Sequence, residues 1–211
     1  MFRKNQLKIV FGLIFLFLSP RLFSQSESPF LKYMNHSWVD SIMKTLTLDE
    51  QIAQCIWVAG WSDKTVAHET EMSSIIKKYG IGGIVFFQGT AEKQAELTNY
   101  YQSISKVPLI ISMDGEWGVG MRLSNVVKFP YQMTLGAIKN DSLIYQMGKA
   151  VGNQFSRAGM QANLAPVADI NNNPGNPVIN YRSFGEDKNN VAAKTISYMK
   201  GMQEANIFTT A

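Results

Sequence analysis

The sequence predicts an α/β fold on a parallel sheet, most closely a (β/α)8 TIM-type barrel of which this chain holds about five of the eight strands. Short apolar runs alternate with helical patterns at intervals of roughly 25 to 45 residues, which is typical of parallel strands joined by crossovers. The runs are apolar throughout, which indicates burial on both faces. No Gly-rich phosphate loop follows a strand, so a barrel is favoured over a doubly wound sheet, which remains possible. The chain has 211 residues, whereas a complete barrel needs about 250.

The first 24 residues are typical of a secretory signal peptide. Ile9 to Leu18 is an apolar run, and Ser24 supplies a small residue at the expected cleavage position. The flanking charges are Arg3, Lys4, Lys8 and Arg21. A membrane anchor is the alternative, but a helix of this length spans only about 15 Å, half of a bilayer core. We therefore expect export from a bacterial cell, to the periplasm or the medium, without a stable membrane anchor, and a barrel domain formed by residues 25–211.

Composition excludes several classes of partner. The net charge of +4 comes from the four basic residues near the start, because removing them from the 20 Lys and Arg leaves 16, equal to the 16 Asp and Glu. With no basic stripe, we expect no nucleic-acid partner. Two widely separated His and the single Cys55 predict no metal site. Cys55 is expected to be a small buried residue, and no motif indicates a cofactor.

Capping patterns place the first elements. Ser37 to Asp40 and Thr47 to Glu50 both match capping boxes, so helices are expected at about residues 38–45 and 48–54. A short strand at residues 55–59 and a loop up to residue 66 should follow.

Helices and strands then alternate along the rest of the chain. The helices are expected at residues 70–79, 91–104, 141–159 and 187–205. The strands are expected at residues 82–87, 109–114, 163–169 and 207–211. One helical face is predicted to carry Leu97, Tyr100 and Tyr101, and another Leu143, Met147, Val151 and Phe155.

Polar residues follow the strand at 109–114. Asp114 and Glu116 lie beside Trp117 and are followed by Arg122. Glycines at 115, 118 and 120 should let the backbone turn tightly and approach a ligand. Carboxylates, an arginine and an aromatic ring suit a sugar, because charged groups hydrogen-bond hydroxyls and a ring stacks on an apolar sugar face. The alternative is a charged turn in which Asp114 or Glu116 pairs with Arg122.

A second polar segment follows the strand at 163–169. Residues 171–187 contain five Asn, two Pro and two Gly, together with Arg182, Glu186 and Asp187. A long loop at the carboxyl end of a barrel strand is where this architecture builds active sites, so a functional role is favoured over disorder.

Three ordered blocks in these regions resemble the amino-terminal barrel of glycoside hydrolase family 3. They are D-x-E-x-G-x-x-x-R-L from Asp114, FPYQMTLGAI from Phe129, and NLAPVADINNNP…RSFGED from Asn163. The resemblance runs from about Trp38 to Ala211. The D-x-E run ending in Arg-Leu is typical of the β-N-acetylglucosaminidase branch. Trp117 departs from the Gly-Gly pair that usually follows the Glu in this family.

The resemblance implies roles for individual residues. Asp114 is expected to accept hydrogen bonds from hydroxyls of the non-reducing terminal sugar, with Arg122 and Arg182 in the same subsite. Glu116 and Asp169 are weaker candidates for this site; Asp169 could instead hold the Asn-rich loop. Glu186 and Asp187 are expected to start the following helix.

The resemblance also implies that no catalytic residue lies within this chain, because the acid/base His and nucleophilic Asp are expected beyond Ala211. His36 and His68 are expected to be surface residues. The implied activity is retaining hydrolysis of terminal β-linked N-acetylhexosamine from β-N-acetylglucosaminides such as peptidoglycan-derived fragments, without a cofactor. The alternatives are β-glucosidase or β-xylosidase specificity, and a non-catalytic sugar-binding protein.

Overall fold

The computed structural model describes residues 33–211, which divide into two units at the boundary between Thr45 and Leu46. In the described part of the first unit, α3 (Ser37–Met43) begins after His36, whose Nδ1 accepts a hydrogen bond from the Trp38 backbone N–H at 3.2 Å. The capping box predicted at Ser37 is therefore wrong, because the imidazole caps the helix one residue earlier. The signal peptide predicted at 1–24 lies outside the described residues. None of the helices in residues 33–211 is long and apolar enough to cross a bilayer.

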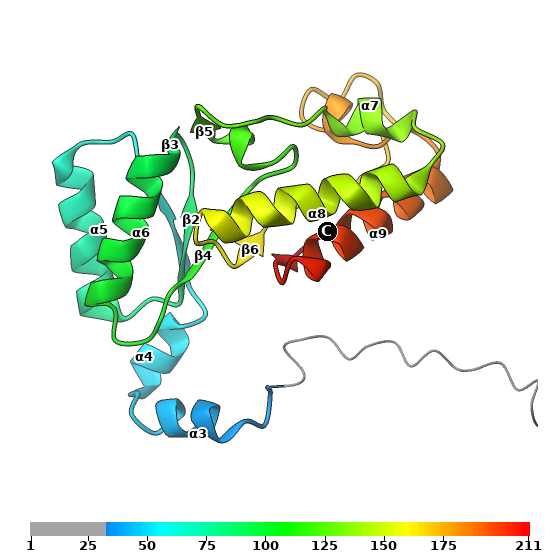
Figure 1. Cartoon of the computed structure of the whole chain (residues 1–211). Helices are drawn as coiled ribbons and strands as arrows, with labels where there is room; N and C mark the ends of the chain where they lie inside the picture. Colours follow the sequence, from blue (N-terminus) through cyan, green and yellow to red (C-terminus); the bar gives the residue numbers. More distant parts are fainter. Residues whose placement is uncertain (1–32) are drawn as a thin grey trace, which may run out of the picture. The chain divides into compact units, whose positions relative to one another are not determined.

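The second unit is built on a five-stranded parallel sheet (Figure 1). Its strands are β1 (Trp57–Gly60), β2 (Gly83–Phe86), β4 (Ile110–Met113), β6 (Ala162–Asn163) and β7 (Phe208–Thr209). They lie side by side in chain order, so each new strand joins the same edge. A doubly wound sheet instead reverses its direction of growth at a switch point. The strand order therefore agrees with the barrel interpretation.

The predicted strand at 163–169 is mostly wrong, because pairing stops after Asn163. The buried side chain of Gln132 replaces a neighbouring strand at this point. Its Nε2 donates to the Val167 carbonyl at 3.3 Å, and its Oε1 accepts from the Val167 N–H at 3.4 Å. Buried backbone groups need partners, and an amide side chain offers one donor and one acceptor, as a peptide group does.

The helices predicted in the second unit are confirmed, although α5 begins at Val66 and not at residue 70. They are α4 (Leu48–Ala53), α5 (Val66–Tyr79), α6 (Ala91–Ile104), α8 (Asp141–Arg157) and α9 (Lys188–Glu204). The capping box at Thr47 and Glu50 is present, and Asp187 caps α9 through a hydrogen bond from the Asn190 N–H at 2.8 Å. Gly80 ends α5 with a φ of 64°, a conformation that glycine adopts without strain.

Several short elements were not expected from the sequence. They are the parallel pair β3 (Gly89–Thr90) and β5 (Leu123–Ser124), the helix α7 (Gln132–Gly136), and the 3-10 helices η1 (Val119–Met121) and η2 (Asn180–Arg182). All five lie in segments that follow the carboxyl ends of strands or link them to the next long helix, where no periodic pattern is long enough to predict them.

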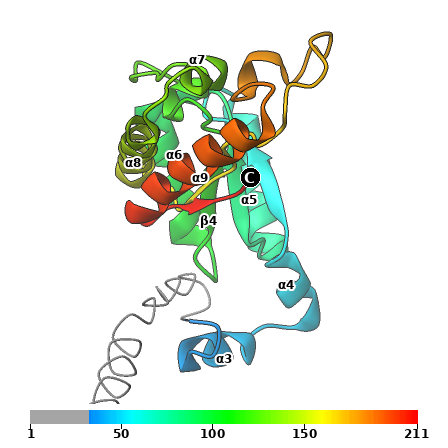
Figure 2. The ribbon, with the colours of Figure 1, turned by 90° about the vertical axis from the view of Figure 1, so that its right-hand side faces the viewer.

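Helices α8 and α9 run side by side in both views of the molecule (Figures 1 and 2). Their backbones approach closely, since a Cβ on Gly148 would lie 2.2 Å from the Tyr198 carbonyl oxygen. Val151, Phe155 and Tyr198 are completely buried. Glycine in this helix therefore has a packing role, and the two helices form one layer beside the sheet.

Three burial predictions are wrong. Leu143 is 48% exposed and Tyr100 is 44% exposed, whereas the neighbouring Ile144 and Tyr101 are buried. The spacing of apolar residues locates the buried face of a helix only to within one residue. Packing then determines which of two adjacent residues points inward. Cys55 is exposed, because it lies in a turn between α4 and β1, and the strand starts two residues later.

We expect residues 25–211 to behave poorly when produced alone. In the described part of the chain the sheet does not close, so β1 and β7 are its edges. Leu48 and Ile52 on α4 are 70% and 56% exposed. Open edges and apolar patches promote association. The expected result is strong binding of an apolar dye and a broad thermal transition.

Replacing Leu48 and Ile52 with Lys should lower dye binding by this isolated segment. Matched Lys substitutions at the exposed polar residues Asn189 and Gln203 of α9 serve as the control. A sharp, cooperative unfolding transition of the unmodified segment in dilute buffer would contradict the prediction.

Candidate functional site

The predicted site residues lie after the carboxyl ends of neighbouring strands. Asp114 directly follows β4, and Glu116 lies two residues further on. Asp169 lies in the segment after β6, Arg122 follows η1, and Arg182 ends η2. In a parallel sheet these ends share one rim, which is the rim where α/β barrels place their active sites.

Asp114 and Arg122 form one ion pair at this rim. Arg122 Nη2 donates to Asp114 Oδ2 at 2.6 Å, and both side chains are partly buried, with 18% and 27% exposed. The Arg122 guanidinium lies 4.7 Å from the centroid of the Phe87 ring. Its Nε is buried and has no hydrogen-bond partner among the described residues. The charged-turn alternative is thus confirmed for Asp114, although the pair keeps exposed surface for a ligand.

Glu116 pairs with Arg182, which is 66 residues away, and not with Arg122. Arg182 Nε donates to both carboxylate oxygens at 3.0 and 3.1 Å, and Nη2 donates to Oε1 at 2.7 Å. The Glu116 side chain is only 2% exposed. A buried carboxylate needs such a partner. Glu116 therefore fixes the orientation of Arg182 and is not available as a free carboxylate.

The Asp114–Arg122 and Glu116–Arg182 ion pairs are electrostatically coupled. Hydrogen bonds to Glu116 raise the pKa of Arg182 above its ordinary value, and the charges of Asp114 and Asp169 raise it further. Asp114 and Glu116 lie two residues apart in one turn, so the Asp114–Arg122 and Glu116–Arg182 pairs are neighbours. Asp114, Arg122 and Arg182 therefore lie at one rim, and their shared role in binding a sugar stays a prediction.

The turn that carries both carboxylates is held by Asn163, which sequence reasoning missed as a site residue. Its Oδ1 accepts from the Gly115 N–H at 2.9 Å, and its Nδ2 donates to the Gly115 carbonyl at 3.2 Å. Tyr198 donates a second hydrogen bond to this carbonyl at 3.1 Å. Burial raises the pKa of the Tyr198 hydroxyl, so it stays a neutral donor. The available signal in the sequence was an Asn at the start of an apolar run that is predicted to be a strand.

The glycines of this turn have different roles. A Cβ on Gly115 would lie 2.5 Å from Phe155 Cζ, so a glycine is needed for packing and not for the predicted approach to a ligand. Gly118 has a φ of 86°, which confirms the tight turn expected there.

The Asn-rich loop is closed at its base. The Asn171 N–H donates to the Gly185 carbonyl at 2.9 Å, and Ser183 Oγ donates to the Asp169 carbonyl at 2.5 Å. It is thus the backbone of Asp169 that anchors the loop, while the residue itself is exposed. Joined ends give a compact loop a defined shape, which places Arg182 against Glu116.

A hollow of about 350 Å³ lies beside Arg122. It is lined by Ser62, Asp63, Gln88, Gly89, Thr90, Arg122 and Ser124. These residues come from segments after β1 and β2 and from the β3–β5 pair. Hydroxyl, amide and charged groups around a rim suit a ligand with many hydroxyls.

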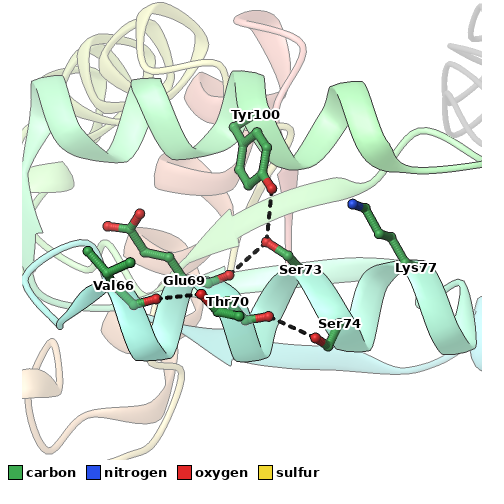
Figure 3. A pocket seen from close by; sticks show the side chains of 7 residues that line it. All are labelled: Val66, Glu69, Thr70, Ser73, Ser74, Lys77 and Tyr100. Carbon is green, nitrogen blue, oxygen red and sulfur yellow. Dashed lines mark hydrogen bonds between the residues drawn. The ribbon is translucent and has the colours of Figure 1, made fainter.

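A second hollow, on α5 and α6, is a poorer candidate (Figure 3). Ser73 Oγ donates to the Glu69 carbonyl at 2.7 Å, and Thr70 and Ser74 bond to carbonyls one turn back in the same helix. Lys93 lies 3.2 Å from the Glu69 carboxylate. Because these polar groups serve the helices, they do not converge on a ligand.

Each histidine accepts a hydrogen bond from a backbone N–H. His36 is exposed and caps α3. His68 lies on α5 and not in a loop, and its side chain is only 13% exposed, so its predicted surface position is wrong. Its Nε2 accepts a hydrogen bond from the Trp61 N–H at 3.3 Å. Within residues 33–211, His, Cys, Asp and Glu form no group of three that could hold a metal ion.

Comparison with known proteins identifies the family. Residues 47–211 match the model of the glycosyl hydrolase family 3 N terminal domain. The chain belongs to glycoside hydrolase family 3. A β-hexosaminidase A from Pseudoalteromonas piscicida is 32% identical over 152 residues, which cover 66% of this chain and 25% of that protein.

Solved structures of the family have the same fold. A glycoside hydrolase family 3 β-N-acetylglucosaminidase from Paenibacillus is 32% identical, with a TM-score of 0.70 over 78% of this chain and 32% of that one. A β-glucoside phosphorylase bound to 2FGlc is 25% identical, with a TM-score of 0.75 over 82% of this chain and 31% of that one. The chain thus spans about a quarter to a third of these relatives, and its sheet is part of the family's barrel domain.

Replacing Asn163 with Leu should destabilise the full-length protein by about 2–4 kcal/mol. The buried backbone N–H and carbonyl of Gly115 would each lose a hydrogen bond to the Asn163 amide. Denaturant unfolding measures the change. Asn153→Leu on the exposed face of α8 is the matched control and should change stability by no more than about 0.5 kcal/mol. Equal stabilities of the two variants would show that this clamp is unimportant.

Proposed function

We propose that the full-length protein hydrolyses terminal β-linked N-acetylhexosamine, with N-acetylglucosamine as the preferred sugar. The gathering of Asp114, Arg122 and Arg182 at one rim carries this proposal. The similarity to a β-hexosaminidase and to a β-N-acetylglucosaminidase, each at 32% identity, supports the choice of sugar.

In this proposal Asp114 accepts hydrogen bonds from hydroxyls of the terminal sugar. Its carboxylate has a second oxygen besides the one paired with Arg122, and it is partly exposed. Hydrogen bonds to an ionised group contribute about 1.5–3 kcal/mol each. Arg122 and Arg182 donate to other oxygens of the same sugar, and each is oriented in advance by its carboxylate partner.

The chemical step is assigned to residues outside the described region. Retaining hydrolysis needs a nucleophile and an acid/base group about 5–5.5 Å apart. Glu116 and Asp114 are both committed to arginines. We place the acid/base His and the nucleophilic Asp in sequence following residue 211, so residues 25–211 bind but do not cleave.

The proposed setting is outside the bacterial cytoplasm, in the periplasm or medium. The basic and apolar pattern of residues 1–24 supports export. Fragments of peptidoglycan with terminal N-acetylglucosamine are the proposed natural substrates. Specificity for β-glucosides is the second candidate, and the similarity to a β-glucoside phosphorylase supports it.

The proposal predicts that the full-length protein releases nitrophenol from the nitrophenyl N-acetyl-β-glucosaminide faster than from the β-glucoside or β-xyloside. Asp114→Asn should lower kcat/KM about tenfold to a hundredfold, because a charged acceptor is lost from the sugar site. Asp49→Asn, at an exposed position of α4, is the control and should have no effect.

Faster cleavage of the glucoside would favour the second candidate. Binding of N-acetylglucosamine without cleavage of any of the three substrates would favour a non-catalytic sugar-binding protein.

A further inference from the structure

Three aromatic side chains from separate segments meet at the rim. The ring centroids of Trp117 and Tyr131 lie 4.7 Å apart, with their planes at 89°. Those of Tyr131 and Tyr181 also lie 4.7 Å apart, and those of Trp117 and Tyr181 lie 6.4 Å apart. Trp117 comes from the turn after β4, Tyr131 from the N-cap of α7, and Tyr181 from η2. We call these three rings the aromatic platform.

The platform retains much exposed ring surface. Tyr131 is 47% exposed and Tyr181 is 48% exposed, although aromatic side chains usually bury most of their area. Clustered apolar surface that remains open next to polar groups is typical of ligand-binding sites. Here the two half-exposed tyrosines belong to one cluster with Trp117, next to the charged pairs.

The platform is continuous with the sugar site. Trp117 directly follows Glu116, and Tyr181 directly precedes Arg182. Consecutive Cα atoms lie about 3.8 Å apart, so both rings branch from the backbone next to the Glu116–Arg182 pair. Because that pair spans the turn after β4 and the Asn-rich loop, it also brings the two rings together.

The backbone holds the platform in place before any ligand binds. The Trp117 carbonyl accepts a hydrogen bond from the Phe129 N–H at 3.0 Å, and Gly118 adopts a φ of 86° next to it. Asn180, before Tyr181, has a φ of 34°, a conformation that non-glycine residues rarely adopt. Helices α7 and η2, which carry the two tyrosines, pack against each other (Figure 1). A preorganised surface loses little entropy on binding.

We propose that the aromatic platform binds the second sugar ring of a β-linked oligosaccharide, next to the terminal sugar held by Asp114, Arg122 and Arg182. This inference rests on the proposed function. Pyranose rings have an apolar face of C–H groups that packs on aromatic rings, while their hydroxyls remain free to bond to tyrosine hydroxyls. The chain would therefore prefer oligosaccharides to glycosides that lack a second ring.

The test compares two substrates on the full-length protein: N,N′-diacetylchitobiose, which has a second sugar, and methyl N-acetyl-β-glucosaminide, which has none. Tyr181→Ala and Trp117→Ala should each lower the ratio of their kcat/KM values by about fivefold to tenfold, because a ring contact is lost only for the disaccharide. Tyr100→Ala, which removes a tyrosine of similar exposure from α6, should leave the ratio unchanged.

A binding measurement separates this inference from the proposed function. Titration with the disaccharide should change the tryptophan fluorescence of the wild-type protein, and Trp117→Phe should remove most of that change while it retains a ring. If the wild-type protein cleaves neither substrate but shows this Trp117-dependent binding, the proposed function fails and the platform stands.

If the protein cleaves both substrates and the platform variants keep the wild-type ratio, the platform is wrong and the proposed function stands. Absence of both cleavage and Trp117-dependent binding would overturn both.

Discussion

The candidate site depends on one buried side chain, the amide of Asn163. It makes hydrogen bonds to the backbone N–H and to the carbonyl of Gly115, and Asn163 is completely buried. An amide that donates and accepts at the same time holds the two successive peptide groups on either side of the Gly115 Cα atom. Asp114 and Glu116 flank Gly115, so these hydrogen bonds also determine where their carboxylates lie. The strand β6 thereby sets the position of charged groups in the turn that follows the neighbouring strand β4.

From this fixed turn, two ion pairs extend to different parts of the chain. Glu116 is buried, and its desolvation is offset by three hydrogen bonds from Arg182. Asp114 is more exposed and uses one oxygen for Arg122. The first pair thus fixes the Asn-rich loop, while the second retains capacity for a ligand. The rings of the aromatic platform lie next to the buried Glu116–Arg182 pair. They are held in place there and keep exposed ring surface.

The sequence predicted the parallel sheet, the helices and the placement of Asp114, Arg122 and Arg182 after strand ends, because periodicity and strand ends are local features of the chain. It did not predict which carboxylate pairs with which arginine. The partner of Glu116 is 66 residues away, and only the closed loop brings it near. The predicted strand at 163–169 failed for a similar reason, since the side chain of Gln132 takes the place of a partner strand. Side chains that replace backbone partners leave no periodic signal.

The central claim is that Asp114, Arg122 and Arg182 hold a single sugar. A crystal structure of the full-length protein with bound N-acetylglucosamine tests it most directly. The account predicts that oxygens of one sugar lie within about 3 Å of the Asp114 carboxylate and of both guanidinium groups. A sugar bound elsewhere on the barrel, or one that contacts Asp114 while Arg182 lies beyond hydrogen-bond reach, would contradict it.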